Sequence, residues 1–577
     1  MLSVKNPIMT GFFPDPSICR VGNKFYTVHS TFAYFPGVPV FESEDLVHWN
    51  LISNVLDRDS QVPLSGCQHS EGIFAPTIRY HKGTWYMITT NVSDQGNFIV
   101  TAKDPRGPWS EPYYLGESTG GIDPSLFFDD DGTCYYIGQR PRSAGYRYNG
   151  DCEIWIQTLD LDTMKLKPDA TIVLTGFQRK AIWPEGPHLY KKDGYYYILH
   201  AESGTSIHHS VMIARSKNVF GPYEYCPCNP ILTHRHLGAQ YPVTCVGHAD
   251  LVDDGNGNWY MVVLACRPNQ GYTLLGRETF LAKVTWEDGW PVVNAGVGHL
   301  EEVVTLPYEG QPSDDAPQCK TYTFDTPSLP LELLTLRNHR DHELELHAEE
   351  HIVRLFHRCD SLKDCGEPAY LALRQQHWNC EFETSFIPHF CKESDCAGIA
   401  MVQSNENHLR AECYPQDSGV KLVVSLCKDG EDSCLARMDL PAALPIKLKL
   451  RVEGLVASVL YQSNSEWKPV ISDIDLRSLS TGLLFVFAIG KSMDGLRRYR
   501  SGRFGFQTPT SAGLFADSYG FLFVGGLLAG WTFSPHLTEH AGGFVGCTLG
   551  LYASGNGEDA GGYSDFERMT YRELPTN

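Results

Sequence analysis

The sequence predicts an all-β fold in which a five-bladed β-propeller is followed by a C-terminal β-sandwich. Five times along the chain, a carboxylate, imidazole or phenyl side chain is followed 11 or 12 positions later by a Tyr in an aromatic-rich run. These five marked residues are Asp15, Phe74, Asp123, Glu185 and His248. They recur every 49 to 63 residues, a period that accommodates four strands per propeller blade. Blades arranged radially would bring the marked residues to one axis.

Residues 1–305 are expected to form this propeller, which is the expected catalytic domain. Short β-branched and aromatic runs alternate with Gly-, Pro-, Asn- and Asp-rich turns, and long helical periodicity is absent. A glycine opens the turn just before each aromatic run, at Gly22, Gly83, Gly132, Gly194 and Gly257. A sandwich in place of the propeller would not explain the constant offset of the marked residues.

The second half of the chain predicts a different arrangement of sheets. A polar, Pro-rich linker covers residues 306–319. Beyond it, segments such as 380–384 and 447–452 alternate apolar and polar residues, as antiparallel sheets with one face on a core do. We therefore expect a β-sandwich over residues 320–577.

One stretch of this second domain breaks the alternation. Residues 482–538 mix a basic cluster with an apolar, Gly-rich run, while the flanking segments 478–481 and 539–543 would join naturally. We expect an anomalous insertion that packs poorly, so that a chain lacking 482–538 is more stable than the whole chain. The sequence leaves open whether the insertion folds.

Composition restricts the partners of the protein. The net charge is −21, which disfavours nucleic acid and anionic membranes because both bind basic surfaces. No apolar run reaches the ~20 residues of a membrane helix, and the first residues show no basic-then-apolar leader. We expect a cytoplasmic protein without nucleic-acid or membrane partners. Secretion and homo-oligomer formation are left open.

Three of the marked residues are carboxylates in short Pro-containing segments, Phe-Pro-Asp-Pro-Ser at 13–17, Gly-Ile-Asp-Pro-Ser at 121–125 and Trp-Pro-Glu-Gly-Pro-His at 183–188. Proline fixes the backbone beside the carboxylate and removes a hydrogen-bond donor. Each segment alone could be an ordinary turn. Three carboxylates at equivalent points repel one another and destabilise a fold, so we interpret them as an active site.

These segments resemble the three signatures of glycoside hydrolase family 43. Further matching stretches lie at 30–37, 75–78, 247–250 and 275–279, and the resemblance covers residues 5–481 and 539–575. It implies a five-bladed propeller with an Asp, Asp, Glu triad at its centre, and a C-terminal sandwich of the concanavalin-like jelly-roll type. The similarity is greatest to two-domain β-xylosidases and α-L-arabinofuranosidases.

The resemblance implies a role for each carboxylate. Asp15 is the general base that activates water, Glu185 is the general acid that protonates the leaving oxygen, and Asp123 orients Glu185 and keeps its pKa high. Physical chemistry supports this division, because an inverting glycosidase needs one ionised and one protonated carboxyl roughly 6.5–9.5 Å apart. No cofactor is required for this chemistry.

Five other residues match positions that bind sugar or a cation in the family. Arg277 resembles an arginine that hydrogen-bonds sugar hydroxyls; the alternative is a surface ion pair with its neighbour in the chain. Phe32 and Phe74 are expected to wall the sugar pocket, and Phe544 resembles a sandwich-domain loop that closes it. His248 resembles a histidine near the axis. A structural calcium at His248 and a purely hydrogen-bonding His248 both stay open, since calcium prefers oxygen ligands.

The predicted function is that of an exo-acting inverting glycoside hydrolase, a β-1,4-xylosidase that releases xylose from xylo-oligosaccharide ends in xylan degradation. An α-L-arabinofuranosidase or a dual-activity enzyme is the alternative, because the two sugars have similar hydroxyl layouts around the reacting carbon. A non-catalytic carbohydrate-binding propeller is a remote alternative, which the presence of all three carboxylates disfavours. Pentose-containing oligosaccharides are the expected partners. Linkage and metal identity are not given by the sequence.

Overall fold

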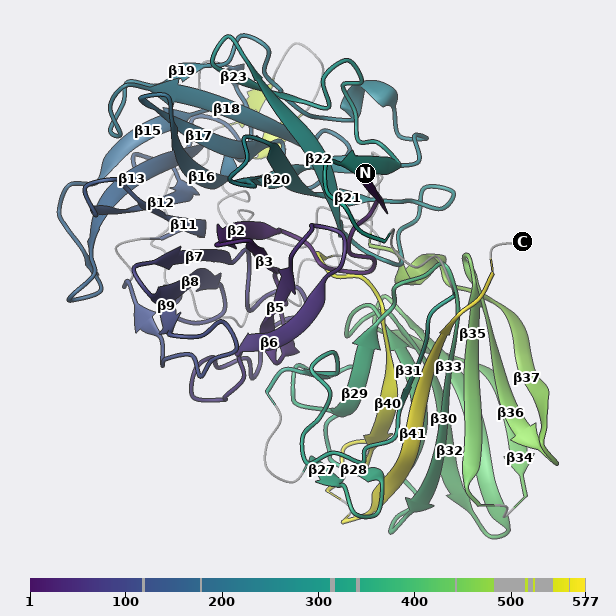
Figure 1. The fold of residues 1–577 in the computed structure, drawn as a ribbon. Coiled ribbons are helices and arrows are strands. Elements are labelled where there is room, and N and C mark those ends of the chain that lie inside the picture. Colours follow the sequence, from purple (N-terminus) through teal and green to yellow (C-terminus); the bar gives the residue numbers. More distant parts are fainter. Residues whose placement is uncertain are drawn as a thin grey trace.

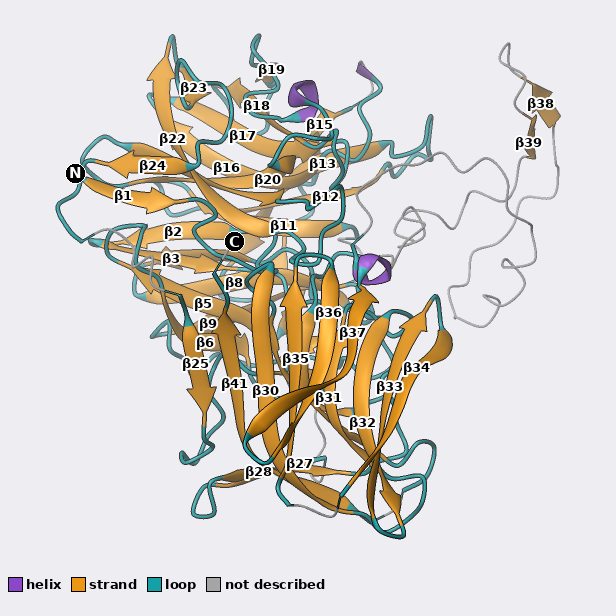
Figure 2. Ribbon diagram, turned by 90° about the vertical axis from the view of Figure 1, so that its right-hand side faces the viewer, coloured by secondary structure: helices purple, strands orange, loops and turns teal. Residues whose placement is uncertain are grey.

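The computed structural model describes residues 1–575 apart from 117–119, 177–178, 312–316, 339–342, 442–443, 482–513, 517–521, 525–542 and 560. Two β-rich bodies lie against each other, with the first half of the chain forming a ring of sheets and the second half forming a layered pair (Figure 1). The strands of the second body extend away from the first (Figure 2). The strands are accompanied by the 3₁₀ turns η2 (Arg235–Leu237) and η3 (Arg477–Leu479). The all-β prediction is confirmed.

The ring consists of five antiparallel sheets that follow one another along the chain, which confirms the five-bladed propeller. Blade 1 contains β2 (Ser17–Val21), β3 (Lys24–Val28), β5 (Gly37–Ser43) and β6 (Asn50–Leu56); blade 2 contains β7 (Thr77–His81), β8 (Thr84–Asn91), β9 (Gly96–Ala102) and β10 (Tyr113–Tyr114). Blade 3 contains β11 (Ile122–Phe128), β12 (Cys134–Pro141), β13 (Cys152–Asp160), β14 (Lys165–Leu166) and β15 (Thr171–Thr175). Blade 4 contains β16 (Glu185–Lys192), β17 (Tyr195–Glu202), β18 (Ser210–Ser216) and β19 (Glu224–Tyr225); blade 5 contains β20 (Thr244–Asp253), β21 (Trp259–Cys266), β22 (Glu278–Glu287) and β23 (Trp290–Val293).

The first strand of each blade lines the axis. Strands β2, β7, β11, β16 and β20 contact one another in a closed circle, each touching the first strand of the next blade. The predicted glycine turns follow these strands, and the five glycines have φ values of 63°, 80°, 87°, 74° and 97°. Only glycine adopts such angles without strain. The constant offset in the sequence therefore runs from the marked residue along the axial strand and through the glycine turn into the second strand of the blade.

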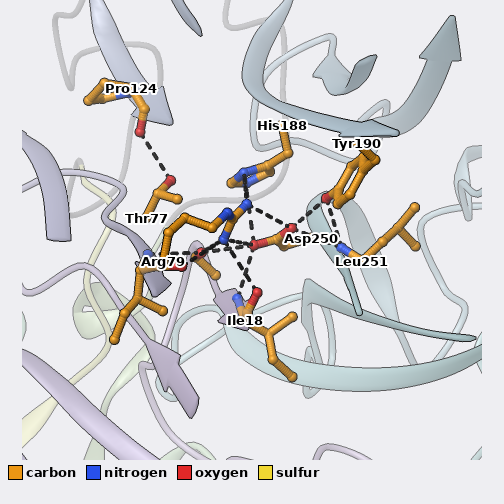
Figure 3. A network of polar contacts seen from close by, with 10 residues as sticks. Ile18, Thr77, Arg79, Pro124, His188, Tyr190, Asp250 and Leu251 are labelled. Carbon is orange, nitrogen blue, oxygen red and sulfur yellow. Dashed lines mark hydrogen bonds and ion pairs between the residues drawn. The ribbon is translucent and has the colours of Figure 1, made fainter. Parts of the chain in front are cut away.

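A buried ion pair joins the axial strands (Figure 3). Arg79 on β7 reaches the fully buried carboxylate of Asp250 on β20 at 3.1 Å. The same carboxylate accepts a hydrogen bond from the backbone N–H of Ile18 on β2 at 3.0 Å and one from the hydroxyl of Tyr190 on β16. Burial raises the pKa of Asp250, but Arg79 and the hydrogen bonds from Tyr190 and Ile18 outweigh it and lower the pKa to about 2. Asp250 thus stays charged and links blades 1, 4 and 5 to Arg79 of blade 2.

Blades 2 and 3 are joined beside this pair. Thr77 on β7 donates its hydroxyl to the carbonyl oxygen of Pro124 on β11 at 3.0 Å, and Arg79 donates to His188 Nδ1 on β16 at 3.1 Å. Burial lowers the pKa of His188 to about 3, so its ring is neutral and can accept this bond. All five axial strands therefore take part in one polar network.

The second body is a sandwich of two eight-stranded sheets. One sheet runs β27 (Leu344–His347), β28 (Ile352–Phe356), β41 (Tyr563–Glu573), β30 (Asn379–His389), β35 (Ile446–Glu453), β36 (Val456–Ser463) and β37 (Glu466–Asp475), with β25 (Cys319–Tyr322) paired to β41. The other runs β34 (Glu431–Leu440), β33 (Gly419–Lys428), β32 (His408–Gln416), β31 (Cys396–Val402), β40 (Thr548–Ser554), β29 (Ala369–Arg374), β26 (Leu334–Leu336) and β4 (Tyr34–Phe35). The last strand, β4, comes from the propeller, so this sheet continues across both bodies.

Buried polar contacts reinforce the junction. The fully buried Arg337 donates from Nε to the carbonyl oxygen of Cys67 at 2.8 Å. Tyr34 bonds Thr548 of the sandwich at 2.9 Å through its hydroxyl, and it packs in an apolar cluster with Tyr370 and Tyr552. The junction is thus built like a protein interior, and it fixes the sandwich at one side of the propeller.

Three features complete the chain. The N-terminal β1 (Leu2–Lys5) pairs with β24 (Val303–Leu306), beside the boundary proposed at residue 305. Most of the predicted insertion at 482–538, and its expected effect on stability, lie outside the described residues; within that range β38 (Leu514–Ala516) pairs with β39 (Leu522–Val524). No helix in the described ranges is long and apolar enough to cross a membrane.

Removing one partner of the axial ion pair is expected to destabilise the propeller strongly. Arg79→Met leaves the carboxylate of Asp250 buried without its cation, which costs about 3–5 kcal/mol for pairs of this kind. Urea unfolding followed by tryptophan fluorescence measures the loss. The double variant Arg79→Met/Asp250→Leu should lose less than the sum of the single changes, because neither charge is left alone.

The matched control is an exposed ion pair in the sandwich. Lys392 and Glu558 lie 2.8 Å apart with about half of each side chain exposed, 44% and 56%. Lys392→Ala should change stability by less than ~1 kcal/mol. Equal losses for Arg79→Met and Lys392→Ala would show that the axial network does not stabilise the fold.

Candidate active site

The three carboxylates meet where the axial strands begin. Asp15 lies just before β2, Asp123 is the second residue of β11, and Glu185 is the first residue of β16. Their mutual electrostatic influence is large enough to shift the pKa of Asp123 and of Glu185. Asp15, Asp123 and His248 also share left-handed backbone angles, with φ of 53°, 54° and 49°. Such angles cost free energy in residues other than glycine and cluster at functional sites.

Asp15 is held in its ionised form. Its Oδ1 accepts a hydrogen bond from Arg277 Nη1 at 2.6 Å, and its Oδ2 accepts one from the Ser30 hydroxyl at 2.7 Å. Burial raises the pKa of Asp15, but Arg277, His248 and the Ser30 hydrogen bond together lower it below its ordinary value. Asp15 is therefore a charged carboxylate at neutral pH.

Asp123 and Glu185 are shifted in the opposite direction. Burial raises the pKa of Asp123 to about 6, and the negative charge of Asp15 contributes to this rise. Burial also raises the pKa of Glu185, and the charges of Asp123 and Asp15 raise it further, well above its ordinary value. Asp123 Oδ2 accepts a hydrogen bond from the backbone N–H of Gly186 at 3.0 Å. Asp123 thus touches the residue next to Glu185 and favours the protonated form of Glu185.

Arg277 lies in the site and does not form the alternative surface ion pair. Its side chain is 7% exposed, and it donates to Asp15 and to the carbonyl oxygen of Phe544 at 3.2 Å. The carboxylate of Glu278 is instead bound on both oxygens by Arg267, each at 2.7 Å. Nε of Arg277 is buried and has no hydrogen-bond partner among the described residues. A guanidinium with a spare donor suits a sugar hydroxyl.

Three phenyl rings gather beside Arg277. Phe32 and Phe74 come from the propeller, and Phe544 comes from the sandwich segment that leads into β40. The ring centroids lie 5.4 Å apart for Phe32 and Phe74, 5.9 Å for Phe32 and Phe544, and 5.8 Å for Phe74 and Phe544. Guanidinium carbon Cζ of Arg277 lies 5.6 Å from the Phe32 ring and 5.4 Å from the Phe544 ring. The sandwich therefore supplies part of the apolar wall of the site.

His248 packs beneath the chain at Glu185. Its Nδ1 lies 3.9 Å from Asp15 Oδ1, and a Cβ added to Gly186 would come within 2.9 Å of its ring. Calcium takes six to eight oxygen ligands, yet among the described residues His248 belongs to no group of three side chains able to hold an ion. The one such group is His408, Cys427 and Asp432 in the sandwich. The calcium expected at His248 therefore stays a prediction.

One residue of the site was missed by the sequence analysis. His209, just before β18, lies with its Nε2 3.9 Å from Glu185 Oε1 and its ring against Gly247. A Cβ at residue 247 would lie 2.4 Å from this ring, so only glycine fits there. His209 precedes the third strand of blade 4, where the offset that marked the axial residues does not apply. No signal in a single sequence singles it out among the 22 histidines.

Comparison with known proteins places this architecture in a family. Residues 4–291 match the model of glycosyl hydrolases family 43, and residues 321–487 and 515–572 match that of the beta xylosidase C-terminal concanavalin A-like domain. The chain is 46% identical to a xylosidase/arabinosidase of Butyrivibrio fibrisolvens over the full length of both proteins. The chain belongs to glycosyl hydrolases family 43. It is a glycoside hydrolase, as the sequence predicted.

Other family 43 proteins share its whole length. The non-reducing end alpha-L-arabinofuranosidase BoGH43B of Bacteroides ovatus is 34% identical over 99% of this chain and 95% of its own. The solved structure of a xylan beta-1,4-xylosidase from Bacillus halodurans C-125 superimposes with a TM-score of 0.82 at 31% identity, covering 99% of this chain and 100% of that one. Both domains of this family 43 enzyme therefore have counterparts in the same order.

Truncation of Phe544 is expected to weaken hydrolysis. Phe544→Ala removes part of the apolar wall that a bound sugar would contact, and a loss of about 1.4 kcal/mol of transition-state binding lowers kcat/KM on aryl glycosides roughly tenfold. Phe544→Leu keeps an apolar wall and should lose less. Phe390→Ala, which removes a ring of the sandwich that packs on His357, serves as control. Unchanged kcat/KM in Phe544→Ala would exclude Phe544 from the site.

Proposed function

We propose that the protein is an exo-acting inverting glycosidase that releases xylose from the ends of xylo-oligosaccharides. Asp15 is the general base, Glu185 is the general acid, and Asp123 modulates the pKa of Glu185. The observation that carries the proposal is the different surroundings of two carboxyls at one end of the propeller axis: Asp15 accepts hydrogen bonds from Arg277 and Ser30, whereas Glu185 lies beside Asp123, which binds the backbone N–H of Gly186. Arg277 and Ser30 hold Asp15 charged, while burial and Asp123 hold Glu185 protonated.

A charged Asp15 and a protonated Glu185 support a single-displacement reaction. Asp15 takes a proton from a water molecule, which attacks the anomeric carbon, while Glu185 gives its proton to the departing glycosidic oxygen. Attack on the face opposite the leaving group inverts the anomeric configuration. Since both proton transfers are supplied by side chains, we propose that hydrolysis needs no metal ion, and a chelator should leave the rate unchanged.

The hydrogen-bond donors and rings favour a sugar at the end of a chain. Arg277 offers a buried, unpartnered Nε–H, and Phe544 brings the sandwich against Phe32 and Phe74 at one side of the site. A site walled by a second domain suits terminal sugars better than the interior of a polymer. Relatives named beta-xylosidase, from Bacillus subtilis and other bacteria, support xylose as the released sugar.

A second candidate is α-L-arabinofuranosidase activity, alone or together with xylosidase activity. The 46% identical relative is named xylosidase/arabinosidase, and the Bacteroides ovatus relative is named an alpha-L-arabinofuranosidase. Comparing kcat/KM on aryl β-xyloside and aryl α-L-arabinofuranoside ranks the two activities in this chain.

The stereochemistry of the product tests the mechanism. Proton NMR recorded within minutes of adding enzyme to an aryl β-xyloside should show α-xylose first, followed by slow mutarotation, with the same result in the presence of chelator. Initial appearance of β-xylose would exclude the inverting mechanism and with it the role of Asp15 as a base.

The role of Glu185 predicts a dependence on the leaving group. Glu185→Gln removes the transferable proton, and acid catalysis typically contributes 10²–10⁴-fold. Activity on xylobiose should therefore fall far more than activity on an aryl xyloside whose leaving group departs without protonation. Asp15→Asn should be inactive on both substrates.

The control is a glutamate of the same blade outside the site. Glu224 on β19 is exposed and pairs with Arg215, so Glu224→Gln should leave both activities unchanged. Equal losses of Glu185→Gln on xylobiose and on the aryl xyloside would contradict the assignment of the acid.

A further inference from the structure

His209 is fixed between blades 4 and 5. Its Nδ1 lies 3.2 Å from the carbonyl oxygen of Cys245 on β20, and its own carbonyl oxygen accepts a hydrogen bond from the Thr233 hydroxyl at 2.7 Å. Its ring rests on Gly247, where a side chain of any size would collide with it. The side chain is 1% exposed. These contacts allow the imidazole ring only one orientation.

The contact with Cys245 also assigns the tautomer. A carbonyl oxygen can only accept a hydrogen bond, so Nδ1 carries the proton and Nε2 presents a lone pair. Burial, reinforced by the neighbouring His248, lowers the pKa of His209 to about 3. The ring is therefore neutral wherever the enzyme is expected to work, and Nε2 is a pure acceptor.

This acceptor faces the proposed general acid. Nε2 of His209 is buried and has no hydrogen-bond partner among the described residues, and it lies 3.9 Å from Glu185 Oε1. An ionised carboxylate would offer it only a second acceptor, whereas a protonated carboxyl offers a donor. The distance of 3.9 Å is longer than a hydrogen bond, and rotation of the partly exposed Glu185 side chain would shorten it. Catalytic hydrogen bonds are often long in the absence of substrate.

We propose that His209 is a positioning residue that accepts the proton of Glu185 in a hydrogen bond and thereby holds the acid protonated and aimed before substrate is cleaved. The inference rests on the proposed function of Glu185 as general acid. Once Glu185 has given its proton to the leaving oxygen, the same lone pair faces a carboxylate and repels it. His209 thus favours return of a proton from solvent to Glu185 after each turnover.

Other groups around Glu185 shift its pKa, some upward and one downward. Asp123 and Asp15 favour its protonated form, and Arg277 favours its ionised form. Cys152 on β13 is also close, and burial raises the pKa of its thiol to about 12, so it is neutral. Of the neutral neighbours described, His209 is the one whose orientation is fixed with an acceptor toward Glu185.

Two substitutions test separately the acceptor atom Nε2 of His209 and the hydrogen bond from its Nδ1 to Cys245. In His209→Asn the amide nitrogen can take the place of Nδ1 and keep the bond to Cys245, but no atom reaches the place of Nε2. In His209→Gln the amide group reaches that place and offers an oxygen acceptor. The pH dependence of kcat/KM on xylobiose is measured for both variants and for the wild type, with thermal unfolding as a check on folding. If the Asn variant does not fold, His209→Ala replaces it.

The alkaline limb of the profile reports loss of the acid proton. In His209→Asn this limb should move to lower pH by about one unit, as removal of a hydrogen bond to the protonated form implies. In His209→Gln it should stay within a few tenths of a unit of the wild type. A general loss of activity with an unmoved alkaline limb in His209→Asn, or equal shifts in both variants, would overturn the inference.

Failure of this inference is distinct from failure of the proposed function. The unequal effect of Glu185→Gln on xylobiose and on the aryl xyloside tests the acid itself and does not involve His209. If that inequality is found and the limb does not move in His209→Asn, Glu185 remains the acid and only the part given to His209 is wrong. If the inequality is absent, the proposed function fails first.

Discussion

The proposed mechanism depends on keeping two neighbouring carboxyls in opposite states of protonation. Burial raises the pKa of both Asp15 and Glu185, so burial alone would favour the protonated form of each. The difference is made by Arg277, whose Nη1 lies 2.6 Å from Asp15 Oδ1. A guanidinium remains charged at every relevant pH, so it fixes Asp15 as the anion. The anions Asp15 and Asp123 then disfavour ionisation of Glu185, and one cation sets the state of the whole group.

The rest of the fold serves to hold these groups in place. Each carboxylate lies at or just before the start of an axial strand, and the axial strands are joined further along their length by Arg79 and Asp250 (Figure 3). A shift of one blade would therefore strain a buried ion pair. The sandwich adds a second constraint, because Phe544 contacts the rings of Phe32 and Phe74 and its carbonyl oxygen binds Arg277. Both domains thus contribute side chains to the candidate site, and the buried junction between them fixes how those side chains meet.

The sequence predicted the parts of this arrangement that repeat. The offset from each marked residue through its glycine turn to the following Tyr is 11 or 12 residues, so the marked residues could be aligned without any coordinates. Contacts between residues far apart in the sequence produce no repeated pattern of this kind. Arg79 and Asp250 are 171 positions apart and pair only once the ring is closed. His209 lies outside the repeated position, and its place at Glu185 follows from packing on Gly247. Phe544 could be suggested only from the family resemblance, because its contact with the propeller depends on how the two domains are joined.

The most direct test is to observe the protonation states themselves. Infrared difference spectra of the resting enzyme, recorded across neutral pH, distinguish a protonated carboxyl from a carboxylate by its carbonyl stretch. The account predicts a protonated carboxyl band at neutral pH that disappears in Glu185→Gln and persists in Asp15→Asn. Absence of the band, or its loss in Asp15→Asn with retention in Glu185→Gln, would contradict the account.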